Sequence, residues 1–223
     1  MGQITWNSKG YKKFDSDGAR EYGIMANEVF APIYPVIAQQ IVDRCQVMRG
    51  LCIDVGSGAA NLSIALAGIT SLNIYAMDFS WHIHEIARKN IEREGLDSQV
   101  IPVVGDVHRM PFHDGVASLI VSRGSMRFWR NKPAAFREFK RVLRPGGKGY
   151  VGGGIGDPRL DEQINREMIR QGMDRQGNRK FKSGKRDIAL LKVVMEKAGF
   201  CRYEIINDAS GFWVCFEKEE ERR

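Results

Sequence analysis

The sequence predicts one doubly wound α/β domain, with a mostly parallel sheet, an antiparallel strand near the C-terminus and helices on both faces. Strand and helix signals alternate through the middle of the chain, which is typical of βαβ units. An apolar strand at Leu51–Val55 runs directly into a glycine-rich turn. The length of 223 residues suits one generous domain.

Seven short apolar segments are predicted to form the strands. They are Leu51–Val55, Asn73–Met77, Val100–Val104, Ala117–Ser122, Lys148–Gly153, Arg202–Ile206 and Gly211–Glu217. Segments with helical periodicity separate most of them: Asn61–Ala67, Trp81–Glu94, Pro133–Leu143 and Ile188–Ala198.

Residues that begin and end helices support these boundaries. Ser80 is a suitable N-cap for the second helix, and Gly95 a suitable stop. Pro133 opens the third helix at its first turn, where proline is favoured. Arg144–Gly147 then reads as a turn between that helix and the fifth strand, and Gly199 ends the last helix.

The chain divides into four parts around this alternation. Residues 11–46 predict an N-terminal helical cap, 47–155 the core, 156–187 a polar lid or insert, and 188–223 the final helix and strand pair. Long excursions of this kind are usually functional segments. Both are expected near the carboxyl ends of the strands, where open α/β sheets bind ligands.

Composition excludes several classes of protein. Hydrophobic residues make up 43% and charged residues 27%, an ordinary globular balance. The longest apolar stretches are too short to span a bilayer, and the first residues lack the apolar core of a signal peptide, so we expect a cytoplasmic protein. The cysteines form no CxxC pair, which argues against a zinc site, and we expect no metal.

The formal charge of +7 is concentrated in two runs. Nine basic residues and one acid lie between Arg123 and Lys148, and six basic residues without an acid lie between Arg175 and Arg186. Such runs attract phosphates, nucleic acid or anionic lipid, although many are only solvated faces.

The glycine loop is the strongest local signal. The first strand ends in Asp54, and Gly56 and Gly58 then allow a tight turn and close approach of a ligand to the backbone. The helix that follows points its positive N-terminus at the same place. By itself this turn fits dinucleotide-binding enzymes as well as other nucleotide-binding proteins.

Three further features narrow the choice among nucleotide-binding proteins. The second strand ends in Asp78, where an acid can accept both hydroxyls of a ribose. The third strand ends in Gly105-Asp106-Val107, where a carboxylate can accept the exocyclic amine of adenine while the next N–H meets a ring nitrogen. The run from Val142 to Gly147 places an L-R-P-G-G segment before the fifth strand.

This set of motifs resembles the class I S-adenosylmethionine-dependent methyltransferases, and within them the small type 11 group, over Leu51–Gly152 and the C-terminal strand pair. The resemblance implies a Rossmann-like fold and S-adenosyl-L-methionine as the cofactor. It implies that Asp54 faces the amino end of the methionine moiety through water, backed by Gly56, Ser57 and Gly58. It implies further roles for Asp78 at the ribose, Phe79 beside the adenine, and Asp106 with Val107 at the adenine edge.

One residue departs from the family pattern. Ala60 stands where the family usually has a third glycine. We expect its methyl group either to crowd the following helix against the cofactor or to tighten the packing of the loop.

The acceptor side is less clearly marked. The candidate base is His108, which follows the adenine-reading acid, and the candidate anion or substrate contact is Arg123, at the end of the fourth strand. Tyr22 is a further candidate for substrate contact. It belongs to a possible aromatic cap made by Trp6, Tyr11, Tyr22 and Tyr34.

The leading hypothesis is in-line transfer of a methyl group to a small-molecule acceptor. In one form of this hypothesis the acceptor is an anion. In such enzymes the cofactor supplies the activated methyl group and the protein positions the nucleophile. One alternative is an RNA methyltransferase that uses the basic surface. Another is a regulator that binds S-adenosylmethionine without turnover, and a nicotinamide-dependent dehydrogenase is a more distant possibility.

Overall fold

The computed structural model describes residues 16–172 and 185–220. The expected cap residues Trp6 and Tyr11 lie outside the described residues, as do 173–184 of the expected polar lid and most of the second basic run.

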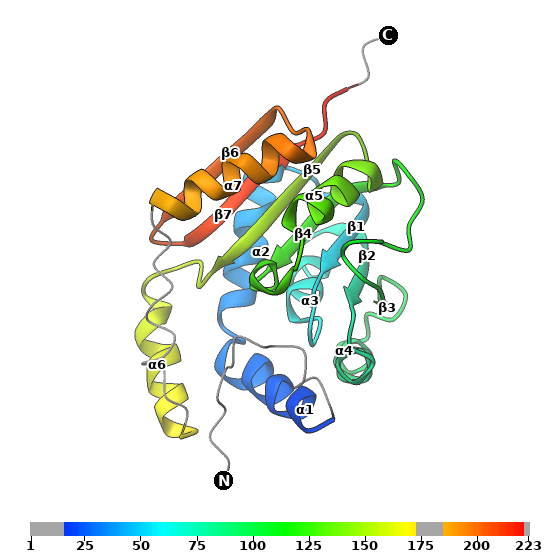
Figure 1. Cartoon of the computed structure of the whole chain (residues 1–223). Helices are drawn as coiled ribbons and strands as arrows, with labels where there is room; N and C mark the ends of the chain where they lie inside the picture. The colour runs from blue at the N-terminus through cyan, green and yellow to red at the C-terminus, as the bar shows by residue number, and fades with distance from the viewer. Residues whose placement is uncertain (1–15, 173–184, 221–223) are drawn as a thin grey trace.

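A seven-stranded sheet in the order β3-β2-β1-β4-β5-β7-β6 forms the centre of the molecule (Figure 1). The strands are β1 (Arg49–Val55), β2 (Ser71–Asp78), β3 (Val100–Val104), β4 (Ala117–Arg123), β5 (Leu143–Gly154), β6 (Arg202–Asp208) and β7 (Gly211–Glu217). The pairs of β1 with β2 and β4, β2 with β3, and β4 with β5 are parallel, whereas β7 is antiparallel to both β5 and β6. The predicted fold class is confirmed.

Helices cover both faces of this sheet and bury an apolar layer on each. On one face α2 (Ile33–Cys45), α3 (Asn61–Ala67) and α4 (Trp81–Arg93) contribute Ile37, Leu66 and Ile91 to a buried cluster with strand residues. On the other face α5 (Lys132–Val142) and α7 (Lys185–Ala198) contribute Phe136 and Met195 to a second cluster. Apolar burial on both faces explains why the central strands are apolar throughout.

The helix boundaries follow local capping chemistry. Ser80 accepts a hydrogen bond from the Ile83 N–H at 3.4 Å, as an N-cap serine should, and Asn131 caps α5 by accepting from the Ala134 N–H at 3.0 Å. Both caps leave the helix N-terminus at the carboxyl end of the preceding strand.

The prediction of a turn at Arg144–Gly147 is wrong. β5 begins at Leu143 and runs through this segment, and its register against β4 shifts between Ala117 and Leu119. The segment is therefore a bulge inside the strand. Gly146 has a φ of +69°, and its N–H donates to the Lys218 carbonyl at 2.9 Å, so the bulged backbone remains paired.

A group of helices beyond the sheet includes part of the expected N-terminal cap. It consists of α1 (Ser16–Ile24), a π-helical turn η1 (Met25–Val29) and, from the expected polar lid, α6 (Leu160–Arg170), whereas α2, also part of the expected cap, packs on the sheet. Gln171, just after α6, donates to the Glu28 carboxylate at 3.0 Å, so the two segments meet (Figure 1). No helix among the described residues is long and apolar enough to cross a membrane.

Candidate active site

The glycine loop is held against the end of β2 by its own backbone. The N–H groups of Gly56 and Ser57 both donate to the Met77 carbonyl, at 2.8 and 3.1 Å. Gly56 and Gly58 have φ values of +67° and +56°, which residues with a side chain rarely adopt. The predicted need for glycine at both positions is therefore a backbone requirement.

Asp54 lies next to the last residue of β1 and is only 1% exposed. Its Oδ2 accepts a hydrogen bond from the Ser63 hydroxyl of α3 at 2.7 Å. Burial raises the pKa of Asp54 to about 7, although the Ser63 hydrogen bonds oppose this shift and the nearby Asp78 adds to it. The carboxyl group is thus poised to titrate near neutral pH.

Asp78 ends β2 beside the glycine loop and connects it to α4. Its Oδ2 accepts from the Gly58 N–H and its Oδ1 from the Ser80 N–H, both at 3.0 Å. Burial raises the pKa of Asp78, while these backbone hydrogen bonds oppose the rise. A carboxylate has about four acceptor positions, and backbone N–H groups of Gly58, Phe79 and Ser80 use three of them here.

Asp106 follows β3 with an exposed side chain and is linked to His108. Its Oδ1 accepts from the His108 N–H at 2.9 Å and lies 2.7 Å from the ring Nδ1. The other ring nitrogen of His108, Nε2, accepts from the Asn131 N–H at 3.2 Å. Partial burial acts to raise the pKa of Asp106, but the hydrogen bonds from His108 outweigh it, and the pKa is lowered. Both nitrogens of the candidate base His108 are therefore engaged.

The remaining predicted cofactor residues flank these acids. Phe79 is 47% exposed directly after Asp78, so one face of its ring is open to a ligand. Val107 is buried beside Asp106.

The candidate acceptor residues meet beneath the cap. Tyr22 of α1 packs on the glycine loop so closely that a Cβ at Gly58 would lie 2.7 Å from its hydroxyl oxygen. Arg123 ends β4, and its Nε and Nη2 donate to the Gly154 carbonyl at 3.3 and 3.2 Å. The guanidinium carbon of Arg123 lies 5.0 Å from the centre of the Phe30 ring and 5.8 Å from that of Tyr34.

Sequence reasoning missed two residues of this arrangement. Ser63 is a polar residue within an otherwise apolar helix, and that contrast signals a buried polar partner. Phe30 lies in the bend between η1 and α2, four residues before Tyr34 of the predicted aromatic cap, and that closeness in the sequence is its signal. Either signal is readable in the sequence once the strand ends are known.

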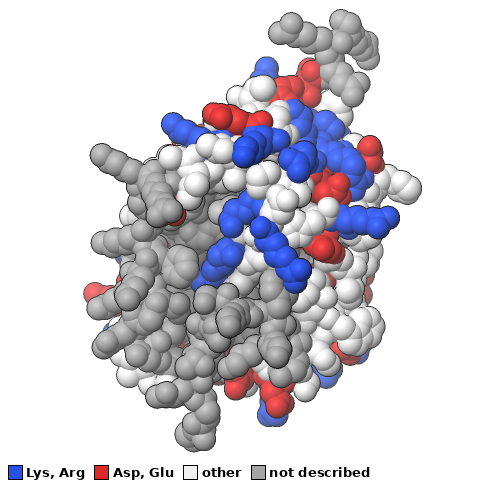
Figure 2. Space-filling view, in the orientation of Figure 1, with Lys and Arg blue, Asp and Glu red and all other residues white. Residues whose placement is uncertain are grey.

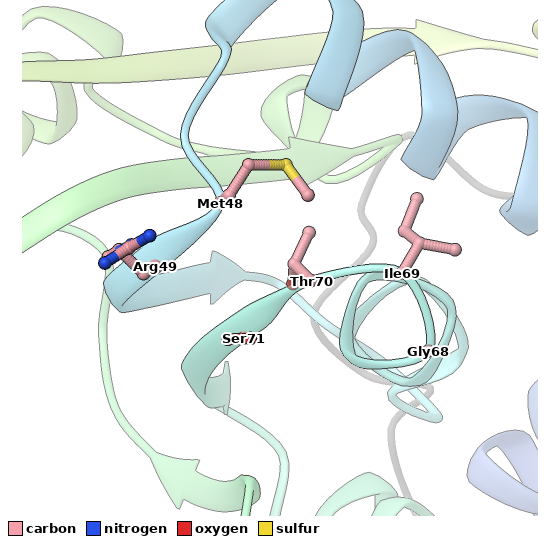
Figure 3. Close-up of a pocket in the computed structure, with 6 residues that line it drawn as sticks. All are labelled: Met48, Arg49, Gly68, Ile69, Thr70 and Ser71. Atoms are coloured by element: carbon pink, nitrogen blue, oxygen red, sulfur yellow. The ribbon is translucent and has the colours of Figure 1, made fainter.

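A hollow in the surface lies away from these residues. It measures about 520 Å³ and is found where α3 ends and β1 and β2 begin (Figure 3). Its lining residues are Met48, Arg49, Gly68, Ile69, Thr70 and Ser71. These residues are at the amino ends of the parallel strands, opposite the edge where such sheets bind ligands. We therefore assign the hollow no part in the site.

The comparisons with known proteins agree with this geometry. A family model described as a methyltransferase domain matches residues 53–151. A solved structure from Methanococcus maripaludis, described as an S-adenosyl-L-methionine-dependent methyltransferase, is 44% identical, with a TM-score of 0.88 over 97% of this chain and 99% of that one. The chain belongs to the class I S-adenosyl-L-methionine-dependent methyltransferases.

More distant relatives match only part of this methyltransferase. The methyltransferase GfsG of Streptomyces halstedii is 30% identical over 50% of this chain and 41% of its own length. A ubiquinone/menaquinone biosynthesis C-methyltransferase of Neisseria meningitidis is 26% identical over 58% of this chain and 53% of its own. The chain thus spans about half the length of the curated relatives it matches.

The site of this methyltransferase fits the cofactor of its family. The hydroxyl oxygen of Ser57 is buried in the glycine loop without a hydrogen-bond partner among the described residues, so it is available to a ligand there. Asp54 and Asp78 supply negative charge for a cofactor that carries a sulfonium and an ammonium group. Glycine at 56 and 58 lets the backbone approach that cofactor closely.

Ala60 of the methyltransferase has a backbone conformation that favours glycine. Its φ is +65°, in the left-handed region, and its side chain is fully buried in the apolar cluster beside α2 and α3. The methyl group therefore packs into the core. The sequence left two possibilities for Ala60, crowding of the helix against the cofactor or tighter packing of the loop. The buried methyl group agrees with tighter packing.

Proposed function

We propose that this methyltransferase transfers a methyl group, in line, from S-adenosyl-L-methionine to a small molecule held beneath the N-terminal cap. The observation that carries the proposal is the contact between Tyr22 of α1 and Gly58 of the glycine loop. A cap that reaches this loop encloses the place where a donor bound to the loop would present its methyl group. Such an enclosure suits a compact acceptor better than a polymer.

The proposed cofactor contacts follow from the site. Asp54 faces the ammonium group, Asp78 holds the ribose hydroxyls, and Ser57 gives its free hydroxyl to the same ligand. Phe79 lies against the adenine, whose edge is read by Asp106 and the Val107 N–H. The bound cofactor supplies a methyl group already activated on a sulfonium, so the protein need only position the acceptor and exclude water.

The two tyrosines of the cap act as neutral hydrogen-bonding groups. Burial raises the pKa of Tyr22 and of Tyr34, so both hydroxyls stay protonated at neutral pH. They can donate to or accept from an acceptor without carrying charge. His108 remains a candidate base only if its bond to Asp106 or to the Asn131 N–H opens, so we assign it first a role in holding Asp106.

The charge pattern gives less support to the alternative that the protein methylates RNA. Figure 2 shows basic side chains gathered in the upper half of this face, with acidic side chains among them. Arg141 of the first basic run pairs with Asp114 and Glu138, each at 2.7 Å, and Lys140 with Glu219 at 3.3 Å. Paired cations offer little attraction to phosphates.

The relatives add a modest argument for a small acceptor. The Neisseria relative is named for the biosynthesis of ubiquinone and menaquinone, which are small molecules. That name describes the relative alone, and it makes a metabolite the first acceptor class to test here.

The test is a transfer assay with methyl-labelled S-adenosyl-L-methionine, offered separately with a metabolite extract and with total RNA. We expect label in the small-molecule fraction and its loss in Asp78→Ala, which removes the proposed ribose contact. Asp97→Asn, which removes an exposed acid in the turn after α4, serves as the matched control and should retain transfer. Label in RNA alone, or cofactor binding without transfer to either pool, would overturn the proposal.

A further inference from the structure

The cation at the end of β4 has only neutral partners. Arg123 donates through Nε and Nη2 to the Gly154 carbonyl, and its guanidinium also hydrogen-bonds the Tyr34 hydroxyl. The Phe30 ring lies beside the guanidinium group, and the ring centre is 5.0 Å from the guanidinium carbon. Among residues 16–172 and 185–220, no carboxylate forms an ion pair with Arg123. A partly buried cation without a counter-ion is costly unless a ligand brings one.

A second cation lies close to the first. Arg127 belongs to the short 3-10 turn η2 (Met126–Phe128) just after β4, and its guanidinium carbon is 4.7 Å from the centre of the Phe128 ring. Burial lowers the pKa of Arg127, and the charge of Arg123 lowers it further. The two guanidinium groups therefore repel each other, and an anion placed between them would relieve the repulsion.

Charges of both signs lie near Tyr22. Burial contributes most to its raised pKa, Asp78 and Asp54 raise it further, and Arg123 opposes them. Tyr22 is thus close both to the acids of the proposed cofactor side and to the cation beneath the cap. Asp78 hydrogen-bonds the glycine loop, whereas Arg123 lies against the Phe30 and Tyr34 rings, so the negative and positive charges belong to different parts of the site.

We propose that Arg123, supported by Arg127 and the Tyr34 hydroxyl, binds an oxyanion of the methyl acceptor, a carboxylate or a phosphate. This inference rests on the proposed function, because it names the class of small molecule that the site accepts. The guanidinium fork matches either group in two parallel hydrogen bonds. The Phe30 and Tyr34 rings would flank the part of the acceptor that carries the anion.

Binding of simple probes to the protein saturated with S-adenosylhomocysteine tests the inference. The probes are benzoate, phenyl phosphate and the neutral benzamide, titrated by calorimetry at constant ionic strength. We expect at least one of the two anions to bind about 10-fold more tightly than benzamide, since a charge-assisted hydrogen-bonded pair has this effect. Arg123→Gln should lose that difference, whereas Arg137→Gln, which removes an exposed cation on α5, should keep it.

A second arm identifies the source of the oxyanion, because the cofactor also carries a carboxylate. S-adenosylhomocysteine has that carboxylate and 5′-methylthioadenosine lacks it, so the ratio of their affinities reports on it. We expect Arg123→Gln to leave the ratio unchanged. If Arg123→Gln weakens the binding of S-adenosylhomocysteine but not that of 5′-methylthioadenosine, Arg123 binds the cofactor carboxylate and the inference is overturned. Wild-type affinity for 5′-methylthioadenosine also shows that the variant is folded.

If Arg123→Gln does not fold, Arg127→Gln takes its place in the same titrations, with a severalfold weaker anion affinity expected. Equal binding of the anions and benzamide by the wild-type protein also overturns the inference. Probe binding requires no turnover. Failure of the probes therefore contradicts this inference alone, whereas absence of methyl transfer to the metabolite extract contradicts the proposed function.

Discussion

Replacing Asp54 by asparagine should change how the stability of the cofactor-free protein depends on pH. The folded-state pKa of Asp54 is about 7, against an ordinary value of 3.8, because the carboxyl group is buried. The folded protein therefore holds a proton that the unfolded chain has already released between these two values. Stability from this group is present at low pH and is lost as pH rises through about 7.

The magnitude follows from the two pKa values. Between pH 5 and pH 8 the ionisation of buried Asp54 should cost the wild-type protein about 2–3 kcal/mol of unfolding free energy. Asparagine has nearly the same shape and does not titrate. The unfolding free energy of Asp54→Asn relative to wild type should therefore rise by about 2–3 kcal/mol over this interval, which corresponds to roughly 5–10 °C in Tm for a domain of this size.

Urea unfolding at pH 5, 6, 7 and 8, without cofactor, measures this difference directly. Asp97→Asn removes the same charge from an exposed turn and controls for net charge. Parallel pH profiles for wild type and Asp54→Asn would refute the reasoning, since they would mean that the buried carboxyl group does not titrate in this range. In the wild-type protein, affinity for S-adenosyl-L-methionine should rise about 10-fold from pH 6 to pH 8, as Asp54 becomes ionised.

Three further variants test the loop, the cap and the core. Gly58→Ala places a Cβ against Tyr22 at a φ of +56°, so we expect at least 10-fold weaker binding of S-adenosylhomocysteine by titration, and unchanged affinity would argue against a close backbone approach. Asn90→Ala removes the hydrogen bond to the Ala59 carbonyl at 2.9 Å and should lower the unfolding free energy by about 1–3 kcal/mol in urea, whereas no loss would show that the loop holds without it. Phe136→Ala in the buried aromatic cluster should cost about 3–5 kcal/mol, and a cost under 1 kcal/mol would contradict its place in the core.

The fold could be predicted because its signals are local. Apolar segments that end in glycine or an acid, separated by capped helices, allow few arrangements other than a parallel sheet. The bulge at Arg144–Gly147 escaped prediction because Arg-Pro-Gly-Gly has the composition of a turn. Only the pairing of Gly146 and Gly147 with Lys218, far along the chain, keeps that segment in the strand.

The candidate site was predictable in part for the same reason. Asp54, Asp78 and Arg123 each lie at or next to the end of a parallel strand, so the sequence places them at one edge of the sheet. The engagement of both nitrogens of His108 was not predictable, because it depends on Asn131, 23 residues away. The left-handed backbone at Ala60 was also hidden, since alanine gives no sign of positive φ.

The sequence by itself determined the order of strands and helices, the glycine loop and the edge at which the acids emerge. These depend on side-chain periodicity and backbone freedom, which act over a few residues. The tertiary structure alone decided that the Ser63 hydroxyl donates to Asp54, that Tyr22 covers Gly58, and that Arg123 lies beside aromatic rings without a carboxylate partner among the described residues. Those contacts join segments distant in the chain, and only packing brings them within reach.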